Sequence, residues 1–363
     1  MNSSALLRRS LISALATLAC VEVAAGIVDP MERPAAMLSA SQRPALLDVT
    51  RAGDRLVAVG ERGVIMVSTD NAKSWTQSPS PVAVTLTAVY FVTPLKGWAV
   101  GHSGVVLHTN DGGTRWTRQL DGIQAAQAVL KAAQSDTGTE SRLKVAQQLV
   151  AEAADKPFLA VSFENEVRGV VTGAYGLIFG TEDGGATWTP WLDKIPNPKG
   201  LHLYAVHLDG KSVYLAGEQG LFVRSKDGGQ SFTAIETPYR GSYFTLTSAS
   251  PDQLVLAGLR GNAYRFDTRA DSFQKLEVPI PVSLSASTRL TDGRTMFVNQ
   301  AGQLLISAGN SLMAMKTPLG APAIAVVPTA DGALAVATWN GAKRVDMRVD
   351  RRAEMPAQQP GKP

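Results

Sequence analysis

The sequence predicts an all-β fold, a seven-bladed β-propeller that carries one helical insertion. The first observation is a motif, GHSGVVLHTNDGGTRW at residues 101–116, which recurs at 173–188 and 217–232 and, in degenerate form, at 60–75. The second is its period, because units that open with Gly-x-x-Gly or a remnant of it recur about every 41 residues. The third is the series of short apolar segments between turn residues. Repeats of this length with four strands each are typical of propeller blades.

The units can be followed along the chain from their Gly-x-x-Gly positions. They begin at Gly60, Gly101, Gly173, Gly217, Gly258, Asn299 and Thr338. In the first unit we expect strands at 46–50, 55–59, 64–68 and 74–77. The last three units lack Asp-Gly-Gly but keep apolar strand segments such as LVLAG at 254–258. The propeller is therefore expected to span residues 45–350.

One spacing, the 72 residues between Gly101 and Gly173, is too long for a single blade and contains an insertion at 121–154. Its composition shifts to Ala and Gln, and two sets of apolar residues each share a helical face. These sets are Ile123, Ala126, Leu130 and Ala133, and Leu143, Ala146, Val150 and Ala153. We expect a helical hairpin between blades two and three. Its apolar faces either pack on each other and on the propeller, or dock a partner.

The N-terminus is typical of an exported protein. Residues 1–25 combine Arg8 and Arg9, an apolar run and a small-residue cleavage site, which indicates a signal peptide and a periplasmic location. Cys20, the chain's single cysteine, lies in this segment, so cleavage near Ala25 leaves no thiol chemistry. A lipoprotein anchored through Cys20 is the alternative, although Thr17-Leu18-Ala19 fits a lipobox poorly. The processed chain has 33 basic and 30 acidic residues, which is no nucleic-acid footprint.

The two ends of the propeller pose the problem of ring closure. Residues 26–44 are Pro-rich and read as an extended arm, while the fourth strand of the last unit is weak. We expect residues 35–40 of the arm to complete blade seven and remove an open sheet edge. The polar, Pro-rich tail at 351–363 is predicted to be disordered.

The Asp-Gly-Gly half of the repeat is predicted to be structural. An aspartate at a tight turn can accept backbone N–H bonds across that turn, and the glycines permit backbone angles that are closed to other residues. The aromatic residue that follows is expected to pack between blades. The set comprises Asp70, Asp111, Asp183 and Asp227, with Trp75, Trp116, Trp188 and Phe232.

The Gly-x-x-Gly half lies on the opposite face, because propeller strands alternate in direction. Loops on one face of a scaffold are where binding residues usually lie. The variable turn residues mix aromatic, basic and polar side chains, which suits recognition of a polypeptide. The predicted partner-binding set is Arg62, His102, Tyr175, Glu218, Arg260 and Trp339, joined by Arg240 and Tyr243 from the segment that enters blade five.

Catalysis is not expected, although Asp boxes also occur in sialidase-like hydrolases. Such enzymes need an arginine cluster, a tyrosine nucleophile with an acidic neighbour and an acid/base aspartate. The arginine motif that such enzymes carry before their first Asp box is absent here. Arg240, Arg260 and Tyr243 could be assigned to these roles, but no motif in the sequence singles them out. The four histidines show no metal-ligand spacing, so we expect no metal or cofactor. A glycan-hydrolysing or glycan-binding propeller remains the alternative function.

The segment KGWAVGHSG at 96–104, followed by VVLHTNDGGTRW, resembles the photosystem II stability and assembly factor family of exported propellers with Asp-box (BNR) repeats. The resemblance implies a monomeric, non-catalytic scaffold that binds a membrane-protein subunit through basic residues on one face, here Arg62, Arg240 and Arg260. The insertion and DKPFL at 155–159 resemble a branch from non-photosynthetic proteobacteria, encoded beside exporters of the resistance–nodulation–division type. That branch implies an exporter as the partner, contacted from the periplasmic side.

Overall fold

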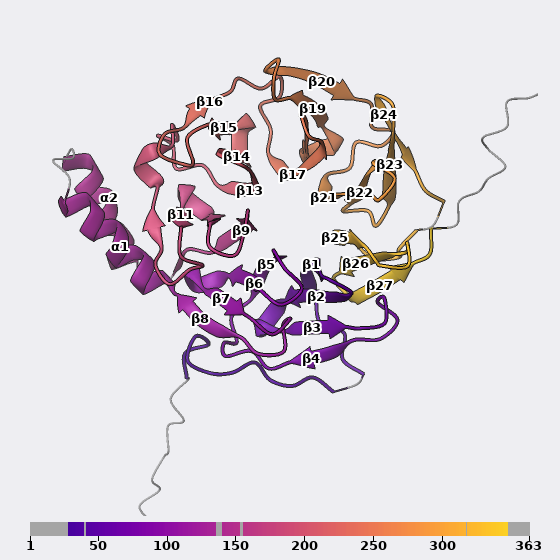
Figure 1. The fold of residues 1–363 in the computed structure, drawn as a ribbon, viewed down its shortest axis with the longest axis horizontal. Coiled ribbons are helices and arrows are strands. Elements are labelled where there is room, and N and C mark those ends of the chain that lie inside the picture. The colour runs from indigo at the N-terminus through magenta and orange to yellow at the C-terminus, as the bar shows by residue number, and fades with distance from the viewer. Residues whose placement is uncertain (1–27, 40, 136–139, 153–154, 317, 348–363) are drawn as a thin grey trace, which may run out of the picture.

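The computed structural model describes residues 28–39, 41–135, 140–152, 155–316 and 318–347. The predicted signal peptide and tail lie outside the described residues. Within them, seven antiparallel sheets form a ring around a central opening (Figure 1). The predicted seven-bladed propeller with a helical insertion between blades two and three is confirmed.

The first four blades are the ones that carry Asp-box sequences. Blade 1 contains β1 (Leu46–Ala52), β2 (Arg55–Gly60), β3 (Ile65–Ser68) and β4 (Thr76–Ser78). Blade 2 contains β5 (Leu86–Phe91), β6 (Gly97–Gly101), β7 (Val106–Thr109) and β8 (Thr117–Leu120). Blade 3 contains β9 (Phe158–Phe163), β10 (Gly169–Gly173), β11 (Ile178–Thr181) and β12 (Thr189–Pro190). Blade 4 contains β13 (Leu203–Asp209), β14 (Ser212–Gly217), β15 (Phe222–Ser225) and β16 (Thr233–Ala234).

The last three blades keep the same order without the Asp-Gly-Gly sequence. Blade 5 contains β17 (Tyr243–Ser250), β18 (Gln253–Gly258), β19 (Ala263–Asp267) and β20 (Ser272–Leu276). Blade 6 contains β21 (Leu284–Arg289), β22 (Thr295–Asn299), β23 (Leu304–Ala308) and β24 (Ser311–Ala314). Blade 7, as far as the structure describes it, contains three strands, β25 (Ala323–Pro328), β26 (Leu334–Thr338) and β27 (Gly341–Val345).

The innermost strand of every blade carries the same irregularity. Its first and third residues pair with successive residues of the second strand, so its second residue bulges out of the ladder. In β1, for example, Leu46 pairs with Gly60 and Asp48 with Val59, which leaves Leu47 without a partner. Bulges bend a strand and redirect side chains. Here they turn the second residue of each inner strand toward the central channel, whose wall includes Leu47 and its six counterparts.

The core consists of apolar layers between neighbouring blades rather than one central cluster. Trp116 packs with Val57 and Ile65 of blade 1, and its ring stands edge-on to Phe91 at 6.0 Å. Trp98 of blade 2 stacks on Phe163 of blade 3 with ring centres 3.4 Å apart. Each blade therefore buries its faces against two neighbours, which explains why an isolated repeat cannot be stable.

The insertion forms two helices, α1 (Gly122–Ser135) and α2 (Glu140–Ala151), which stand outside the ring beside blade 3 (Figure 1). Ala126 and Ala146 are buried, as their assigned faces predict. Ile123 and Val150 of the same faces are exposed, so packing within the molecule accounts for only part of each predicted face. Ala153 lies outside the described residues. The hairpin packs on blades 2 and 3 through Ala125, Val129 and Leu149, and Arg142 of α2 pairs with Asp193.

The predicted role of the N-terminal arm is wrong. The arm follows β4 of blade 1, where the Ala35 N–H donates to the Ser80 carbonyl and the Gln77 side-chain amide donates to the Ala36 carbonyl (Figure 1). Met31 is buried in the layer between blades 1 and 2, which anchors the arm to that edge. The described part of the arm thus protects the edge of blade 1, and β27 pairs only with β26 among the described strands.

The ring closes by packing and by a polar contact between blades 1 and 7. Small residues of β25 and β26 pack against Leu46, Val49 and Leu56. The Arg344 guanidinium donates to the Asn71 carbonyl at 2.7 Å and to Asp331 Oδ1 at 3.1 Å. The Ala330 N–H donates to Asn71 Oδ1 at 3.0 Å. No helix among the described residues is long and apolar enough to cross a membrane.

Candidate functional site

The two faces of the ring are built from different halves of the repeat. On the Asp-box face the carboxylate of each box accepts hydrogen bonds from its own turn. Asp227 Oδ1 accepts from the Ser225 hydroxyl at 2.7 Å and from the Gln230 and Ser231 N–H groups at 3.0 Å each. The Ser231 hydroxyl, which donates to Oδ2, and these further donors hold the pKa of Asp227 well below its usual range. Equivalent bonds surround Asp70, Asp111 and Asp183.

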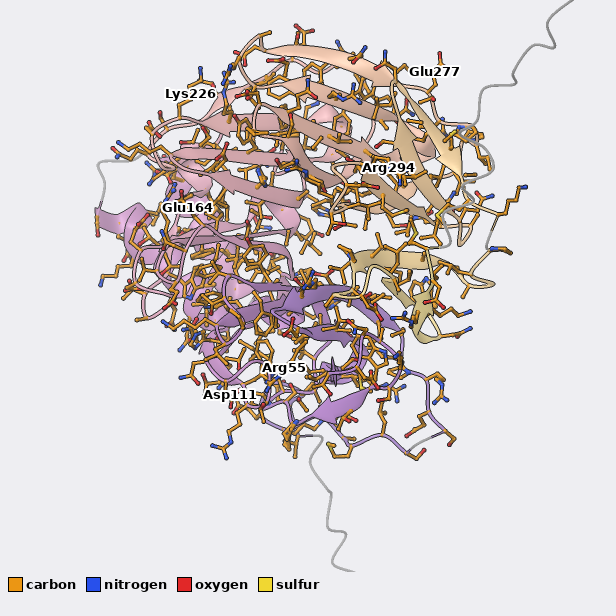
Figure 2. The ribbon with its side chains drawn as sticks, turned by 45° about the vertical axis from the view of Figure 1, so that its right-hand side comes forward. Arg55, Asp111, Glu164, Lys226, Glu277 and Arg294 are labelled. Atoms are coloured by element: carbon orange, nitrogen blue, oxygen red, sulfur yellow. The ribbon has the colours of Figure 1, made fainter. Side chains whose placement is uncertain are left out.

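These turns also lock neighbouring blades together. The Arg55 guanidinium of blade 1 donates to the Asp111 carbonyl of the blade 2 box at 3.2 Å, and Figure 2 shows both residues on this side of the ring. The Trp98 indole donates across the blade boundary to the Gly184 carbonyl at 3.3 Å. Trp188 and Phe232 are buried between blades, and Trp75 is partly buried against blade 7. The Asp-box turns thus form hydrogen bonds both within themselves and to the neighbouring blade.

The Gly-x-x-Gly turns lie where the inner strands begin. The Glu61 N–H donates to the Ala45 carbonyl just before β1, and His102, Ala174, Glu218, Leu259 and Gln300 make the same bond in their blades. In five blades the third residue of the turn has a positive φ although it is not glycine. These residues are Arg62 (53°), Ser103 (57°), Tyr175 (56°), Gln219 (51°) and Arg260 (56°). A non-glycine residue is strained in this region, and such strain gathers at functional sites.

The structure brings only some of the predicted partner-binding residues together. Tyr175, Glu218 and Arg240 lie on adjacent turns of blades 3 to 5, with the Arg240 backbone beside Gly220 of the blade 4 turn. Arg62, His102, Arg260 and Trp339 are exposed, each on the separate turn of its own blade. The candidate site is therefore centred on blades 3 to 5 rather than spread evenly around the rim.

A chain of aromatic rings runs from this rim into the channel. Tyr175, 59% exposed, lies 4.9 Å from the His202 ring centre, His202 lies 6.0 Å from Tyr204, and Tyr204 lies 5.3 Å from Phe244. All three pairs meet edge to face, the geometry that ring quadrupoles favour. Tyr204 and Phe244 line the channel. We call these four residues the aromatic run.

Two charged residues hold the aromatic run in place. Glu218 Oε1 accepts from the Tyr204 hydroxyl at 3.2 Å, and its Oε2 accepts from the His202 N–H at 2.9 Å. Burial and the neighbouring Glu218 carboxylate raise the pKa of Tyr204 to about 12, so its hydroxyl remains a donor. The Lys156 ammonium lies 4.5 Å from the Tyr175 ring centre and pairs with Glu152 at 2.8 Å. These contacts fix the positions of Tyr175, His202 and Tyr204 relative to the rim.

Tyr243 does not belong to this surface, which corrects its predicted role. Its side chain is fully buried and its ring packs between Tyr239 and Tyr264. The first residue of each inner strand points into the inter-blade core, and Tyr243 is the first residue of β17. A fully buried hydroxyl cannot reach a substrate, so Tyr243 is also unsuitable as the nucleophile of a sialidase-like reaction.

The sequence reasoning missed Lys156, His202, Tyr204 and Phe244. The signal that would have found the two channel residues was present, because Tyr204 and Phe244 each stand second in their inner strands, the position that bulges toward the channel. Lys156 and His202 each precede an inner strand, beside a Gly-x-x-Gly turn. Aligning the repeats on the inner strand as well as on the turn would have brought these four positions together.

The channel itself is a cavity of about 590 Å³ lined by residues of all seven inner strands. Its wall contains Asp48, whose two carboxylate oxygens accept from the Val49 and Val89 N–H groups at 2.8 Å each. Burial raises the pKa of Asp48 to about 7, against the lowering effect of these two bonds. Asp48 thereby joins blades 1 and 2 across the bulge. Among the described residues, no group of three or more His, Cys, Asp or Glu side chains is placed to hold a metal ion.

Comparison with known sequences supports the resemblance found in the repeat. The model of the family described as photosynthesis system II assembly factor YCF48 matches residues 139–308. The photosystem II assembly lipoprotein Ycf48 of Synechococcus sp. (strain CC9902) is 29% identical over 118 residues, which are 32% of this chain. The match spans 35% of that relative's length. The resemblance to this family is therefore confirmed.

Solved structures show the same fold. A structure of YCF48 bound to D1 peptide has a TM-score of 0.60 at 14% identity and covers 87% of this chain and 97% of its own. YCF48 from Cyanidioschyzon merolae has a TM-score of 0.59 at 14% identity, over 85% of this chain and 97% of its own. A streptogramin B lyase has a TM-score of 0.65 at 12% identity, over 86% and 97%. At these identities the likeness concerns the fold alone, because one propeller architecture carries binding proteins and enzymes alike.

Proposed function

We propose that this protein is a non-catalytic assembly scaffold that binds a polypeptide segment of a membrane protein on its Gly-x-x-Gly face. The observation that carries the proposal is the aromatic run, an ordered path of rings from exposed Tyr175 to the channel wall at Phe244. Aromatic side chains dominate binding energy at protein interfaces because they bury a large area at low entropic cost. A peptide laid along this path would contact all four rings.

The contrast between the two faces supports the choice of surface. The Asp-box carboxylates are occupied by their own turns, whereas the Gly-x-x-Gly turns hold strained, exposed side chains. A peptide ligand also agrees with the solved neighbour described as YCF48 bound to D1 peptide. The resemblance to the assembly-factor family supports a scaffold in place of an enzyme.

The finer parts of the proposal concern location and partner. We place the scaffold in the periplasm as a monomer, on the basis of the exported N-terminus that the sequence predicts. The partner we propose is an exporter of the resistance–nodulation–division type, contacted through its periplasmic part. Arg240 is exposed and lies beside the blade 4 turn that carries Glu218, and we expect it to contact acidic or polar groups of that partner.

Site-specific photo-crosslinking in living cells tests the proposal. Tyr175 is replaced by p-benzoyl-phenylalanine, which keeps an aromatic side chain at the exposed end of the run. The matched control carries the same residue at Thr114, an exposed position of the blade 2 Asp-box turn on the opposite face. We expect a membrane protein to be captured at position 175 and not at position 114, with its identity read by mass spectrometry.

Two results would contradict the proposal. Equal capture at both positions would mean that the Gly-x-x-Gly face is not a specific surface. Capture of soluble proteins alone at position 175 would replace the membrane scaffold by an adaptor for a soluble partner. Capture of a membrane protein that is not an exporter would support the scaffold function and contradict the exporter as its partner.

A further inference from the structure

The channel wall includes the second, third and fifth residues of the inner strands, and the third residues are alanine in all blades except blade 1 (Asp48) and blade 5 (Thr245). The second and the fifth residues form two rings of side chains. The bulge in every inner strand places its second residue in the wall near the Gly-x-x-Gly face, and its fifth residue lies in the wall three positions further along. At about 3.3 Å per residue the two rings are roughly 10 Å apart. We call them the upper and the lower ring.

The upper ring is predominantly apolar. Five of its seven positions hold large apolar or aromatic side chains, all half-buried: Leu47, Leu159, Tyr204, Phe244 and Ile324. The other two are Thr87 and Ser285, whose hydroxyls donate to the Phe158 carbonyl at 2.7 Å and the Ala323 carbonyl at 2.8 Å. Because these hydroxyls are engaged by backbone, the ring offers an apolar collar at the mouth of the channel.

The lower ring has the opposite character. Six of its positions hold polar side chains, namely Thr50, Tyr90, Ser162, His207, Thr247 and Thr288, and the seventh is Val327. An apolar group that enters from the Gly-x-x-Gly face therefore contacts the upper ring and the mostly alanine third residues, and within roughly 10 Å it reaches the hydroxyls and the imidazole of the lower ring. That depth suits one large side chain, whereas a long acyl chain would have to lie against the polar ring.

We propose that the upper ring is a pocket for a single large apolar side chain, such as Leu, Met or Phe, of the bound polypeptide. The inference rests on the proposed function, because the aromatic run leads the polypeptide to this pocket. Tyr204 and Phe244 belong to both features, so a main chain that lies over Tyr175 and His202 brings its next residues over the channel mouth. The pocket supplies the anchor, and the run supplies the contact surface around it.

β25 offers a matched pair of variants to test the pocket. Ile324 belongs to the upper ring and Val327 to the lower ring, and both are half-buried β-branched residues of the same strand. Peptides that bind the purified full chain are first selected from a displayed library of random sequences. One selected peptide is then synthesised with a fluorescein label, and its Kd is measured with wild type, Ile324→Thr, Val327→Thr and Tyr175→Ala.

We expect the selected peptides to share one large apolar residue, and its replacement by Ser to weaken binding by at least about tenfold. Ile324→Thr should weaken binding about tenfold, while Val327→Thr should change it less than about twofold. Circular dichroism and thermal unfolding of the two variants serve as a check that both keep the fold.

The remaining outcomes separate the pocket from the surface around it. If Tyr175→Ala weakens binding of the peptide and Ile324→Thr does not, the proposed pocket is wrong, while the proposed function is still supported. Equal losses in Ile324→Thr and Val327→Thr would also overturn it, because the lower ring should not touch the ligand. A library that yields no binding peptide would count against both the pocket and the peptide-binding function.

Discussion

The Asp-box face and the Gly-x-x-Gly face both contain tight turns with positive φ, but the residues at the positive-φ positions differ. In the Asp boxes of blades 2 to 4 these positions are glycine pairs, such as Gly112 (76°) and Gly113 (88°), which adopt the conformation without strain, whereas the degenerate box of blade 1 has Asn71 (62°) and Ala72 (65°) there. On the other face the first positive-φ position holds side chains such as Tyr175 and Gln219, and only the next residue is glycine. The complete Asp boxes thus avoid backbone strain, whereas five Gly-x-x-Gly turns accept it at a residue that carries a side chain.

The faces also differ in what their polar groups do. Asp-box carboxylates receive several donors from their own turn, so they stabilise the turn that joins two strands of the blade. On the other face Glu218 uses its carboxylate to hold two aromatic residues of the run. A repeated motif is therefore not a repeated binding site: its most uniform half holds the fold together, and its most variable half carries the candidate function.

The largest expected difference between the two halves of the repeat concerns stability, and it can be measured by replacing one tryptophan of each half. Trp116 is buried between blades, and its indole donates to the Gly113 carbonyl at 3.0 Å. We expect Trp116→Ala to lower the free energy of unfolding by about 3–5 kcal/mol, through loss of buried area and a residual cavity. Trp339→Ala, at a 56% exposed turn residue, should change it by less than about 0.5 kcal/mol. Urea unfolding of both variants measures the difference, and similar losses would refute the division of roles.

A second test uses the acid that lies between the faces. Asp48 has a raised pKa of about 7, so between about pH 4 and about pH 7 the native protein holds a proton that the unfolded chain has released. Stability should therefore fall as the pH rises through this range, by at most about 4 kcal/mol. Asp70 shows the opposite sign, because the Ser74 hydroxyl and further donors lower its pKa to about 2, so its contribution is lost on acidification.

Asp48→Asn removes the titration and isolates its effect. The amide oxygen keeps one of the two N–H bonds, and we expect the decline in stability between about pH 4 and about pH 7 to become much shallower. Urea unfolding across this pH range, with wild type in parallel, measures the slope. An unchanged slope would show that folding does not raise the pKa of Asp48.

The smallest expected effect concerns the backbone strain at Gln219 in the Gly-x-x-Gly turn of blade 4. Gln219→Gly at φ 51° relieves the left-handed conformation, offset in part by the greater freedom of glycine in the unfolded chain. We expect a gain of about 0.5 kcal/mol in the free energy of unfolding, and none for Gln219→Ala, which keeps the strain. Thermal unfolding measures it. A loss of stability in the glycine variant would mean that the Gln219 side chain, not the backbone angle, decides the energy of this turn.

The repeat, the Asp boxes and the insertion could be predicted from the sequence because their signals are local. An Asp-Gly-Gly turn specifies its own hydrogen bonds, and a shift to Ala and Gln with helical periodicity specifies helices. Ile123 shows the limit of local signals. Helical periodicity places Ile123 on an apolar face of α1. Which residues of that face contact the ring depends on how the hairpin packs against blades 2 and 3.

The repeat alone was enough to predict the number of blades, the two kinds of turn and the side of the ring on which each lies. The position of the arm along β4, the burial of Tyr243 and the path formed by Tyr175, His202, Tyr204 and Phe244 became visible only in the folded chain. The physical reason is closure of the ring. Seven inner strands, far apart in sequence, meet around one channel, and a bulge in each of them decides which side chain faces the core and which faces the channel.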